Sequence, residues 1–183
     1  MKKSIALFAV IILGFQFSHA QRFLTKNGHI KFYSETPIET IEAHNYQVNS
    51  ALDIGAGDFV FKVLMKSFEF EKALMQEHFN ENYIESHKYP NATFVGKVTN
   101  HEDIDFTQEG SYEAVVEGKL TIHGVTNDIK ETGTFKVKDG VIHGTSVFNV
   151  KLKDYDIKIP KAVTENIAET IEVTVDVKLE KME

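Results

Sequence analysis

Apolar side chains fall on every second residue along most of this sequence. Between residues 46 and 54 the alternating positions are Tyr46, Val48, Leu52 and Ile54. A period of two predicts a strand that buries one face and exposes the other. The same spacing recurs in residues 59–65, 112–122, 129–137, 142–152 and 171–179. The pattern therefore predicts an all-β chain.

Turn chemistry indicates how these strands pair. Asp139 and Gly140 join two alternating runs, and an Asp-Gly pair accepts the positive φ angles of a two-residue hairpin. Neighbouring strands are therefore expected to be antiparallel. Long antiparallel strands with one apolar face must close into a barrel or stack as a sandwich.

Small residues recur on the expected inward face. They are too small to fill the centre of a barrel, so they favour a hollow interior. The alternative is that they allow strand coiling, bulges or close packing against aromatic rings on facing strands. The residues concerned are Ser34, Ser50, Gly96, Ala114, Gly118, Gly133, Gly144 and Ser146.

One segment breaks the strand pattern. In EKALMQEHFNENYIES, residues 71–86, the apolar positions are spaced by three and four residues, which predicts a short amphipathic helix. Its inward side would carry Leu74, Met75, His78, Phe79 and Tyr83. Such a helix either closes the open end of a barrel as a lid or packs permanently as part of the core.

The N-terminus has the layout of a secretory signal peptide. Lys2 and Lys3 precede an apolar run over residues 5–17, and Ser18-His19-Ala20 forms a small-x-small cleavage site. The run is shorter than the roughly 20 residues of a membrane span. We expect cleavage after Ala20, a periplasmic or secreted protein, one mature domain over 21–183, and no stable membrane insertion of that domain.

Charge and composition disfavour several classes of ligand and of reaction. Removing Lys2 and Lys3 from the 20 basic residues leaves 18 against 27 acidic ones, a formal charge of −9, which disfavours nucleic acid and anionic headgroups. There is no cysteine and no G-x-S-x-G motif, and histidines such as His29 and His44 lack metal-ligand spacing. We therefore expect no catalytic residue, no metal and no cofactor, and hence not an enzyme.

Three sequence blocks carry a family resemblance. They are HFNENYIESHKYPNATFVGKV at 78–98, VVEGKLTIHGVTNDIK at 115–130 and FNVKLKDYDIKIP at 148–160. In order and spacing they resemble the YceI-like family, exported lipocalin-like domains that bind polyisoprenoid lipids. The first strand, GHIKFYSE, departs from the family's usual opening, and Glu69 to Lys72 replace its frequent Arg-Asp pair. The resemblance therefore supports an apolar channel for the lipid tail more strongly than any particular contact to a headgroup.

The resemblance implies an antiparallel lipocalin-like β-barrel with one short amphipathic helix at its end and an apolar channel for a polyisoprenoid or isoprenoid-quinone tail. The expected channel residues are Phe32, Phe59, Phe61, Phe94, Tyr112, Ala114, Val116, Gly118, Gly133, Phe135, Phe148 and Val173. The expected entrance residues are Leu74, Met75, His78, Phe79 and Tyr83, where His78 either meets a headgroup or is simply hydrogen-bonded at the edge. The alternative function is a filled-core interaction domain that binds a protein partner. The pattern leaves oligomeric state, lipid length and headgroup open.

Overall fold

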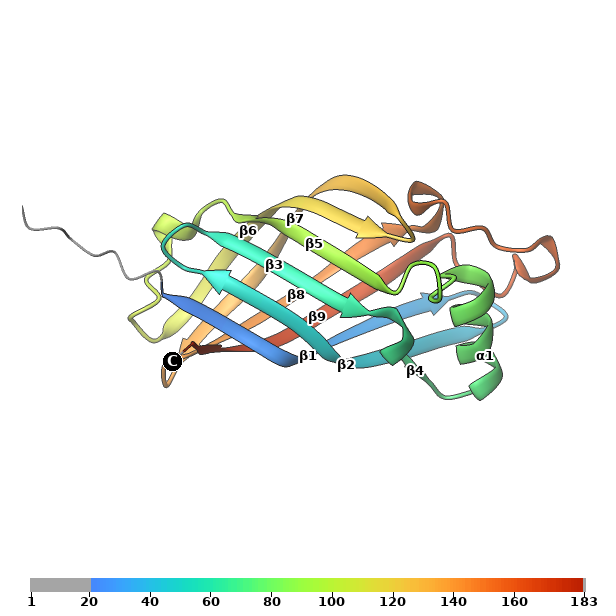
Figure 1. Ribbon diagram of the computed structural model, residues 1–183, viewed down its shortest axis with the longest axis horizontal. Coiled ribbons are helices and arrows are strands. Elements are labelled where there is room, and N and C mark those ends of the chain that lie inside the picture. The colour runs from blue at the N-terminus through green and yellow to red at the C-terminus, as the bar shows by residue number, and fades with distance from the viewer. Residues whose placement is uncertain (1–20, 183) are drawn as a thin grey trace, which may run out of the picture.

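The computed structural model describes residues 21–182, and Figure 1 shows them as one elongated barrel. The expected signal peptide, residues 1–20, lies outside the described residues. The strands are β1 (Arg22–Glu35), β2 (Thr40–Asp53), β3 (Asp58–Leu64), β4 (Glu69–Phe70), β5 (Asn91–Val98), β6 (Gly110–Ile122), β7 (Val125–Lys138), β8 (Val141–Lys151) and β9 (Thr170–Lys181).

Antiparallel pairing closes the sheet on itself. The strand order is β1-β9-β8-β7-β6-β5-β3-β2, and β1 also pairs with β2, so these eight strands form a closed barrel. The short β4 adds to β2 at Ala43 and Phe70. Asp139 and Gly140 have φ angles of 52° and 74° in the β7–β8 turn, the conformation expected of an Asp-Gly hairpin. The expected antiparallel barrel with one short helix is confirmed.

The two ends of the barrel differ. The helix α1 (Ala73–His78) and the π-helical turn Phe79–Tyr83 lie at one end, beside the β1–β2 turn and the segment between β8 and β9 (Figure 1). The opposite end, where β9 finishes, is solidly packed: Leu52, Val98, Ile142 and Leu179 are completely buried there. Of the two ends, the helix end is the one with the larger apolar space. We call the helix end the mouth.

The alternating pattern of β2 reverses part-way along the strand. Asn45 points inward and is completely buried, whereas further along the inward residue is Val48. The register with β1 shifts between Gly28 and Ile30, and such an irregularity turns the following side chains to the other face. Tyr46, expected inside, is consequently 52% exposed. The Asn45 side chain donates to a backbone carbonyl at the end of β3, so its burial leaves no unpaired amide.

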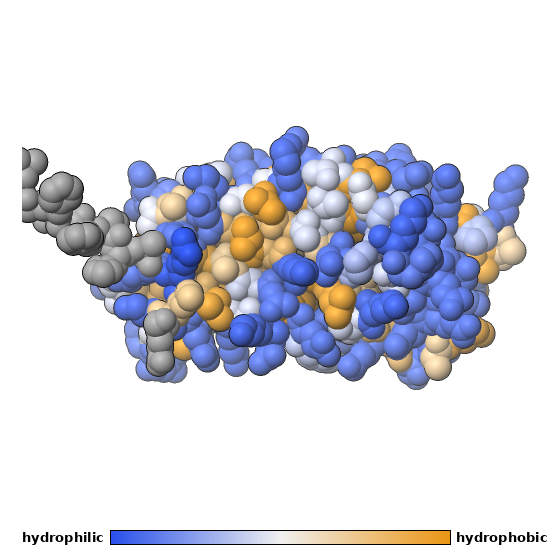
Figure 2. All heavy atoms as spheres, in the orientation of Figure 1, coloured by the Kyte–Doolittle hydropathy of each residue, from blue (hydrophilic) through white to orange (hydrophobic). Residues whose placement is uncertain are grey.

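The outer surface is mainly hydrophilic with isolated hydrophobic clusters in the view of Figure 2. Within residues 21–182, no helix combines the length and the apolarity that crossing a bilayer requires.

Candidate functional site: an apolar cavity at the barrel mouth

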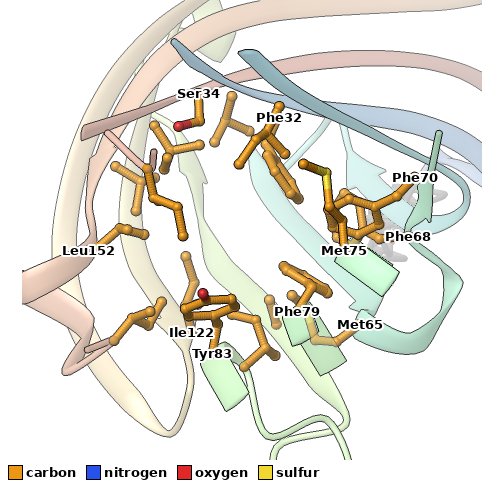
Figure 3. A pocket seen from close by; sticks show the side chains of 18 of the residues that line it. Phe32, Ser34, Met65, Phe68, Phe70, Met75, Phe79, Tyr83, Ile122 and Leu152 are labelled. Atoms are coloured by element: carbon orange, nitrogen blue, oxygen red, sulfur yellow. The ribbon is translucent and has the colours of Figure 1, made fainter. Parts of the chain in front are cut away.

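A cavity of about 310 Å³ lies beneath α1. We call it the mouth cavity. Strands from both sides of the barrel and the π-helical turn supply its walls, and almost every side chain drawn in Figure 3 is hydrocarbon. Its lining includes Ile30, Phe32, Ser34, Glu39, Val63, Met65, Phe68, Phe70, Met75, His78, Phe79, Tyr83, Ile122, Phe148, Leu152, Ile157, Asn166, Ile171 and Val173. Surroundings of this kind favour an apolar ligand.

Four phenylalanine rings hold the helical segment over the cavity. The Phe79 ring centroid lies 5.5 Å from that of Phe32, 5.6 Å from that of Phe68 and 5.1 Å from that of Phe70. Distances of this order are typical of stacked or edge-to-face aromatic pairs. Phe79 therefore packs the segment onto the barrel, and the same ring forms part of the cavity wall.

The helical segment presents one stripe to the cavity. Met75, Phe79 and Tyr83 follow one another at four-residue steps and line it. Leu74, expected on this side, is 61% exposed and lies outside the wall, because it is one residue, about 100° of helical rotation, from Met75. His78 borders the cavity but remains exposed to solvent.

Polar side chains gather at the rim. The Glu39 carboxylate accepts a hydrogen bond from Lys72 Nζ at 3.1 Å and another from Asn166 Nδ2 at 3.2 Å. These bonds, first that from Lys72 and then that from Asn166, hold the pKa of Glu39 below its usual value. Nearby, Ser34 Oγ accepts the backbone N–H of Ala168 at 2.9 Å. Glu39 thus joins the β1–β2 turn to both α1 and the β8–β9 segment, an arrangement we call the rim clasp.

A second, smaller cavity of about 120 Å³ lies deeper in the barrel. We call it the inner cavity. It shares the side chains of Ile30, Val63, Ala92, Leu120 and Phe148 with the wall of the mouth cavity. The two spaces are therefore neighbours that share part of their walls.

Comparison with known proteins identifies the family that has this architecture. A family model described as YceI-like domain matches residues 12–179. The chain belongs to the YceI-like family. No curated protein matches it in sequence.

Solved structures similar to this YceI-like chain share its fold at low sequence identity. A polyisoprenoid binding domain from Saccharophagus degradans, implicated in plant cell wall breakdown, is 14% identical with a TM-score of 0.76 over 88% of this chain and 98% of that one. BcnA of Burkholderia cenocepacia is 14% identical with a TM-score of 0.65 over 83% and 95%. The Campylobacter jejuni YCEI protein is 16% identical with a TM-score of 0.54 over 100% and 99%.

Most site residues expected from sequence lie at one of the two cavities of this YceI-like barrel. Those in the mouth cavity wall are Phe32, Phe148, Val173, Met75, His78, Phe79 and Tyr83. Those in the inner cavity wall are Phe59, Phe61, Phe94, Ala114, Val116, Gly133, Phe135 and again Phe148. Leu74, Tyr112 and Gly118 lie in neither wall. Tyr112 is instead at the closed end, where its hydroxyl donates to the carbonyl of Gln108.

Some of the small inward residues fit the explanation of a hollow interior, and others fit that of close strand packing. Ser34, Ala114 and Ser146 border a cavity. Gly144 also borders the inner cavity, but a Cβ there would lie 3.0 Å from the Phe135 ring, as the close-packing explanation expects. Gly118 does not border a cavity, because a Cβ there would lie 2.4 Å from the Cα of Gly96 and 2.5 Å from a backbone oxygen. Close strand approach, not added space, explains this pair. At Gly133, although it borders the inner cavity, a Cβ would lie 2.6 Å from the backbone oxygen of Thr145.

Several lining residues escaped the sequence analysis. Phe68 and Phe70 follow the 3₁₀ turn Met65–Ser67, which interrupts the period-two pattern, and β4 contains only two residues. Glu39 and Asn166 lie in connections, where side-chain direction has no periodicity. The spacing of Phe68 and Phe70, two residues apart, was the available signal for the aromatic pair.

The described residues offer the site little beyond apolar contact. Within residues 21–182 no group of three or more His, Asp or Glu side chains could hold a metal ion. The polar side chains in the mouth cavity wall are Ser34, Glu39, His78, Tyr83 and Asn166. The arrangement is suited to enclosing a hydrocarbon chain, with polar groups at the rim and one hydroxyl, that of Tyr83, on the helical turn.

Proposed function

We propose that this chain is an exported, non-catalytic carrier that holds the tail of a polyisoprenoid or isoprenoid-quinone lipid in the mouth and inner cavities. The observation that carries the proposal is an apolar cavity of about 310 Å³ beneath a short amphipathic helix. The polyisoprenoid binding domain from Saccharophagus degradans, which has the same fold, supports this ligand class.

The cavity volumes set the length of tail that fits. At roughly 30 Å³ for each small group, the mouth cavity holds about ten carbon groups, or two prenyl units. Burying ten groups gains about 8 kcal/mol, against association costs of at least about 4 kcal/mol. Durable retention therefore requires the inner cavity as well, which brings the enclosed tail to about three prenyl units.

A filled-core interaction domain was the alternative function. The tightly packed closed end is compatible with such a domain. A domain that binds a protein through its acidic outer face, however, does not need an apolar cavity beneath the helix. The hollow therefore favours the lipid carrier.

Solvent extraction tests the proposal directly. The protein is purified from its own host, extracted with organic solvent and analysed by mass spectrometry, and we expect an isoprenoid lipid in stoichiometric amount. Reproducible absence of any such lipid would overturn the proposal.

A matched pair of variants places the lipid. Ala92 lies in the walls of both cavities, so Ala92→Phe should reduce the extracted lipid severalfold. Val95, on the same strand, is 61% exposed, so Val95→Phe should leave the lipid content unchanged. Circular dichroism verifies that both variants fold; if Ala92→Phe does not, Val173→Phe blocks the mouth cavity from another strand. Equal lipid content in the folded variants would place the ligand elsewhere.

Export is part of the same proposal. The Lys-Lys start, the apolar run and the Ser18-His19-Ala20 site support cleavage after Ala20. Mass spectrometry of the intact protein from its own host should give a chain that starts at Gln21 and is recovered from the periplasm or the medium. A chain that retains Met1 and remains in the cytoplasm would contradict it.

A further inference from the structure

A nearly buried histidine connects three segments next to the mouth cavity. His123, in the β6–β7 turn, has only 11% of its side chain exposed. Its Nε2 lies 3.0 Å from a carboxylate oxygen of Glu85, in the loop after the π-helical turn. Its Nδ1 lies 3.2 Å from the backbone oxygen of Tyr155, in the 3₁₀ turn Leu152–Tyr155 that follows β8. We call this set of contacts the histidine bridge.

Each of the three connected segments contributes an isoleucine to the mouth cavity wall. Ile84, Ile122 and Ile157 lie one or two residues from the three members of the bridge in sequence. All three isoleucines line the mouth cavity, and Ile84 and Ile157 are buried. The histidine bridge therefore fixes the segments that form one side of the cavity, whereas the rim clasp joins connections at its opening.

The two partners decide which form of the imidazole ring fits. A neutral imidazole carries one N–H, whereas an imidazolium carries two, and neither a backbone carbonyl nor an ionised carboxylate offers a proton. The hydrogen bond from His123 holds the pKa of Glu85 below its usual value, and the charge of Lys88 adds to this effect against the opposing effect of burial. Glu85 is therefore an acceptor at neutral pH. Both contacts of the ring can be hydrogen bonds only when both nitrogens carry a proton.

The segments packed against the ring carry further titratable groups. Tyr89 packs edge-on against His123, with the two ring centroids 4.6 Å apart, and Lys88 Nζ lies 4.8 Å from the centroid of Tyr89. The carboxylate of Glu85 is the charged group in hydrogen-bond contact with the ring. The remaining titratable groups of these segments are His87, Lys153, Asp154 and Asp156.

Backbone conformation singles out the same place. Glu85, His123 and Asp156, which directly follows Tyr155, have φ angles of 48°, 51° and 54°. A left-handed conformation is unfavourable for residues other than glycine and persists where the surroundings hold it. Among residues 21–182 the other non-glycine residue with a positive φ is Asp139, in the β7–β8 turn. The histidine bridge therefore holds three segments whose backbone is strained at the point of contact.

We propose that His123 is a positioning residue that works as an imidazolium: with both nitrogens donating it fixes one side of the mouth cavity, and loss of a proton releases one partner and loosens that side. Hydrogen bonds to the charged form of a group favour that form. The bridge is therefore present at neutral pH and is lost as the pH rises above it. Its effect on lipid retention rests on the proposed lipid-carrier function, whereas the protonation state of the ring does not.

Nitrogen NMR of the delipidated protein tests the protonation state. The ¹⁵N shifts of the ring distinguish an imidazolium, with two protonated nitrogens, from a neutral imidazole, with one. We expect two protonated nitrogens on His123 at pH 7, and His123→Asn identifies the signals by their absence. A neutral ring at pH 7 would overturn the inference.

Lipid release tests the positioning role. The probe is a deuterated isoprenoid alcohol of three prenyl units, whose transfer to phosphatidylcholine vesicles is followed by mass spectrometry, and we expect wild-type release to be about five- to tenfold faster at pH 9 than at pH 7. In Glu85→Gln the amide can donate to an unprotonated Nε2, so the neutral ring keeps both contacts and release should stay slow at both pH values. His123→Asn, with a residue that tolerates the left-handed backbone, should release at pH 7 as fast as the wild type does at pH 9.

His143→Asn is the matched control. His143 also contacts a carboxylate, that of Asp176 at 2.7 Å, but it lies outside both cavity walls, so its substitution should change neither the release rate nor the pH profile. Circular dichroism verifies folding, and if His123→Asn does not fold, Glu85→Gln decides the test. Alkaline acceleration in Glu85→Gln equal to that of the wild type would overturn the positioning role while leaving the carrier intact. Failure of the wild type to bind the alcohol would refute the carrier and the effect on retention, and the NMR measurement would still decide the protonation state.

Discussion

The ammonium group of Lys72 lies 3.1 Å from the carboxylate of Glu39 and ties the start of α1 to the β1–β2 turn. The same carboxylate holds Asn166 of the β8–β9 segment. Three connections that are distant in sequence thus meet at one side chain on the cavity rim. In the proposed carrier, the rim clasp therefore stands at the exit of the mouth cavity.

Breaking the rim clasp should speed lipid release. Lys72→Met removes the cation but keeps most of the side-chain length, and because an exposed ion pair contributes about 0–1 kcal/mol, we expect the dissociation rate to rise up to about fivefold. Transfer of a labelled lipid to acceptor vesicles measures that rate.

Lys97→Met is the control for this substitution. Lys97 pairs with Asp58 at 3.2 Å and is as exposed as Lys72, but the pair joins β3 and β5 near the closed end. It should leave the dissociation rate unchanged. Equal acceleration by both substitutions would show that the rim clasp does not control release.

Acid should open the same clasp. Hydrogen bonds from Lys72 and then Asn166 lower the pKa of Glu39 from its ordinary value of 4.5. A lowered pKa in the closed form means that the clasp is fully formed above the ordinary value and is lost as pH falls through the lowered one. Lipid dissociation in the wild type should therefore be constant from pH 7 to about pH 5 and accelerate below pH 4.5, with a smaller change in Lys72→Met. Acceleration that is complete by pH 5.5 would assign the effect to another group.

Close strand approach at Gly118 makes a separate prediction about stability. A Cβ there would meet backbone atoms of β5 at 2.4 and 2.5 Å, and backbone cannot move aside as a flexible side chain can. Gly118→Ala should lower the free energy of unfolding by about 1–3 kcal/mol or more, measured by urea denaturation. At Gly55 a Cβ would meet its nearest atom at an ordinary 3.5 Å, so Gly55→Ala should be neutral or slightly stabilising. Similar stability of the two variants would contradict the close approach.

The sequence predicted the antiparallel strands well because the evidence for them is local, whereas alternation alone left barrel and sandwich open and the family resemblance favoured the barrel. Alternation identifies strands one at a time, and Asp139-Gly140 needs only its own backbone preference to predict a hairpin. Tyr46 was misplaced because its direction depends on the β1–β2 register, which is a property of two strands and not of one. The stacked pair His29 and His44, whose ring nitrogens lie 3.0 Å apart, was missed for the same reason.

The sequence predicted an apolar cavity beside the helix but did not predict the residues that form its rim. Met75, Phe79 and Tyr83 follow from helical spacing, so the sequence did place a stripe of the helix against the barrel. The rim clasp did not follow, because Glu39 lies 33 residues from Lys72 and 127 from Asn166, and no periodicity links residues in separate connections. Closure of the barrel is what brings them together.

Two side chains of α1 and the adjoining π-helical turn should differ sharply in their contribution to stability. Phe79 packs on three other phenylalanine rings, whereas Leu74 is 61% exposed. Phe79→Ala removes those contacts and enlarges the mouth cavity. Because the ring is only half-buried, the free energy of unfolding should fall by roughly 2–3 kcal/mol, less than for a fully buried phenylalanine. Leu74→Ala should change the free energy of unfolding by less than about 0.5 kcal/mol. Urea denaturation of the delipidated proteins measures both, and a larger loss for Leu74→Ala would mean that the helix rests on the barrel through the opposite side.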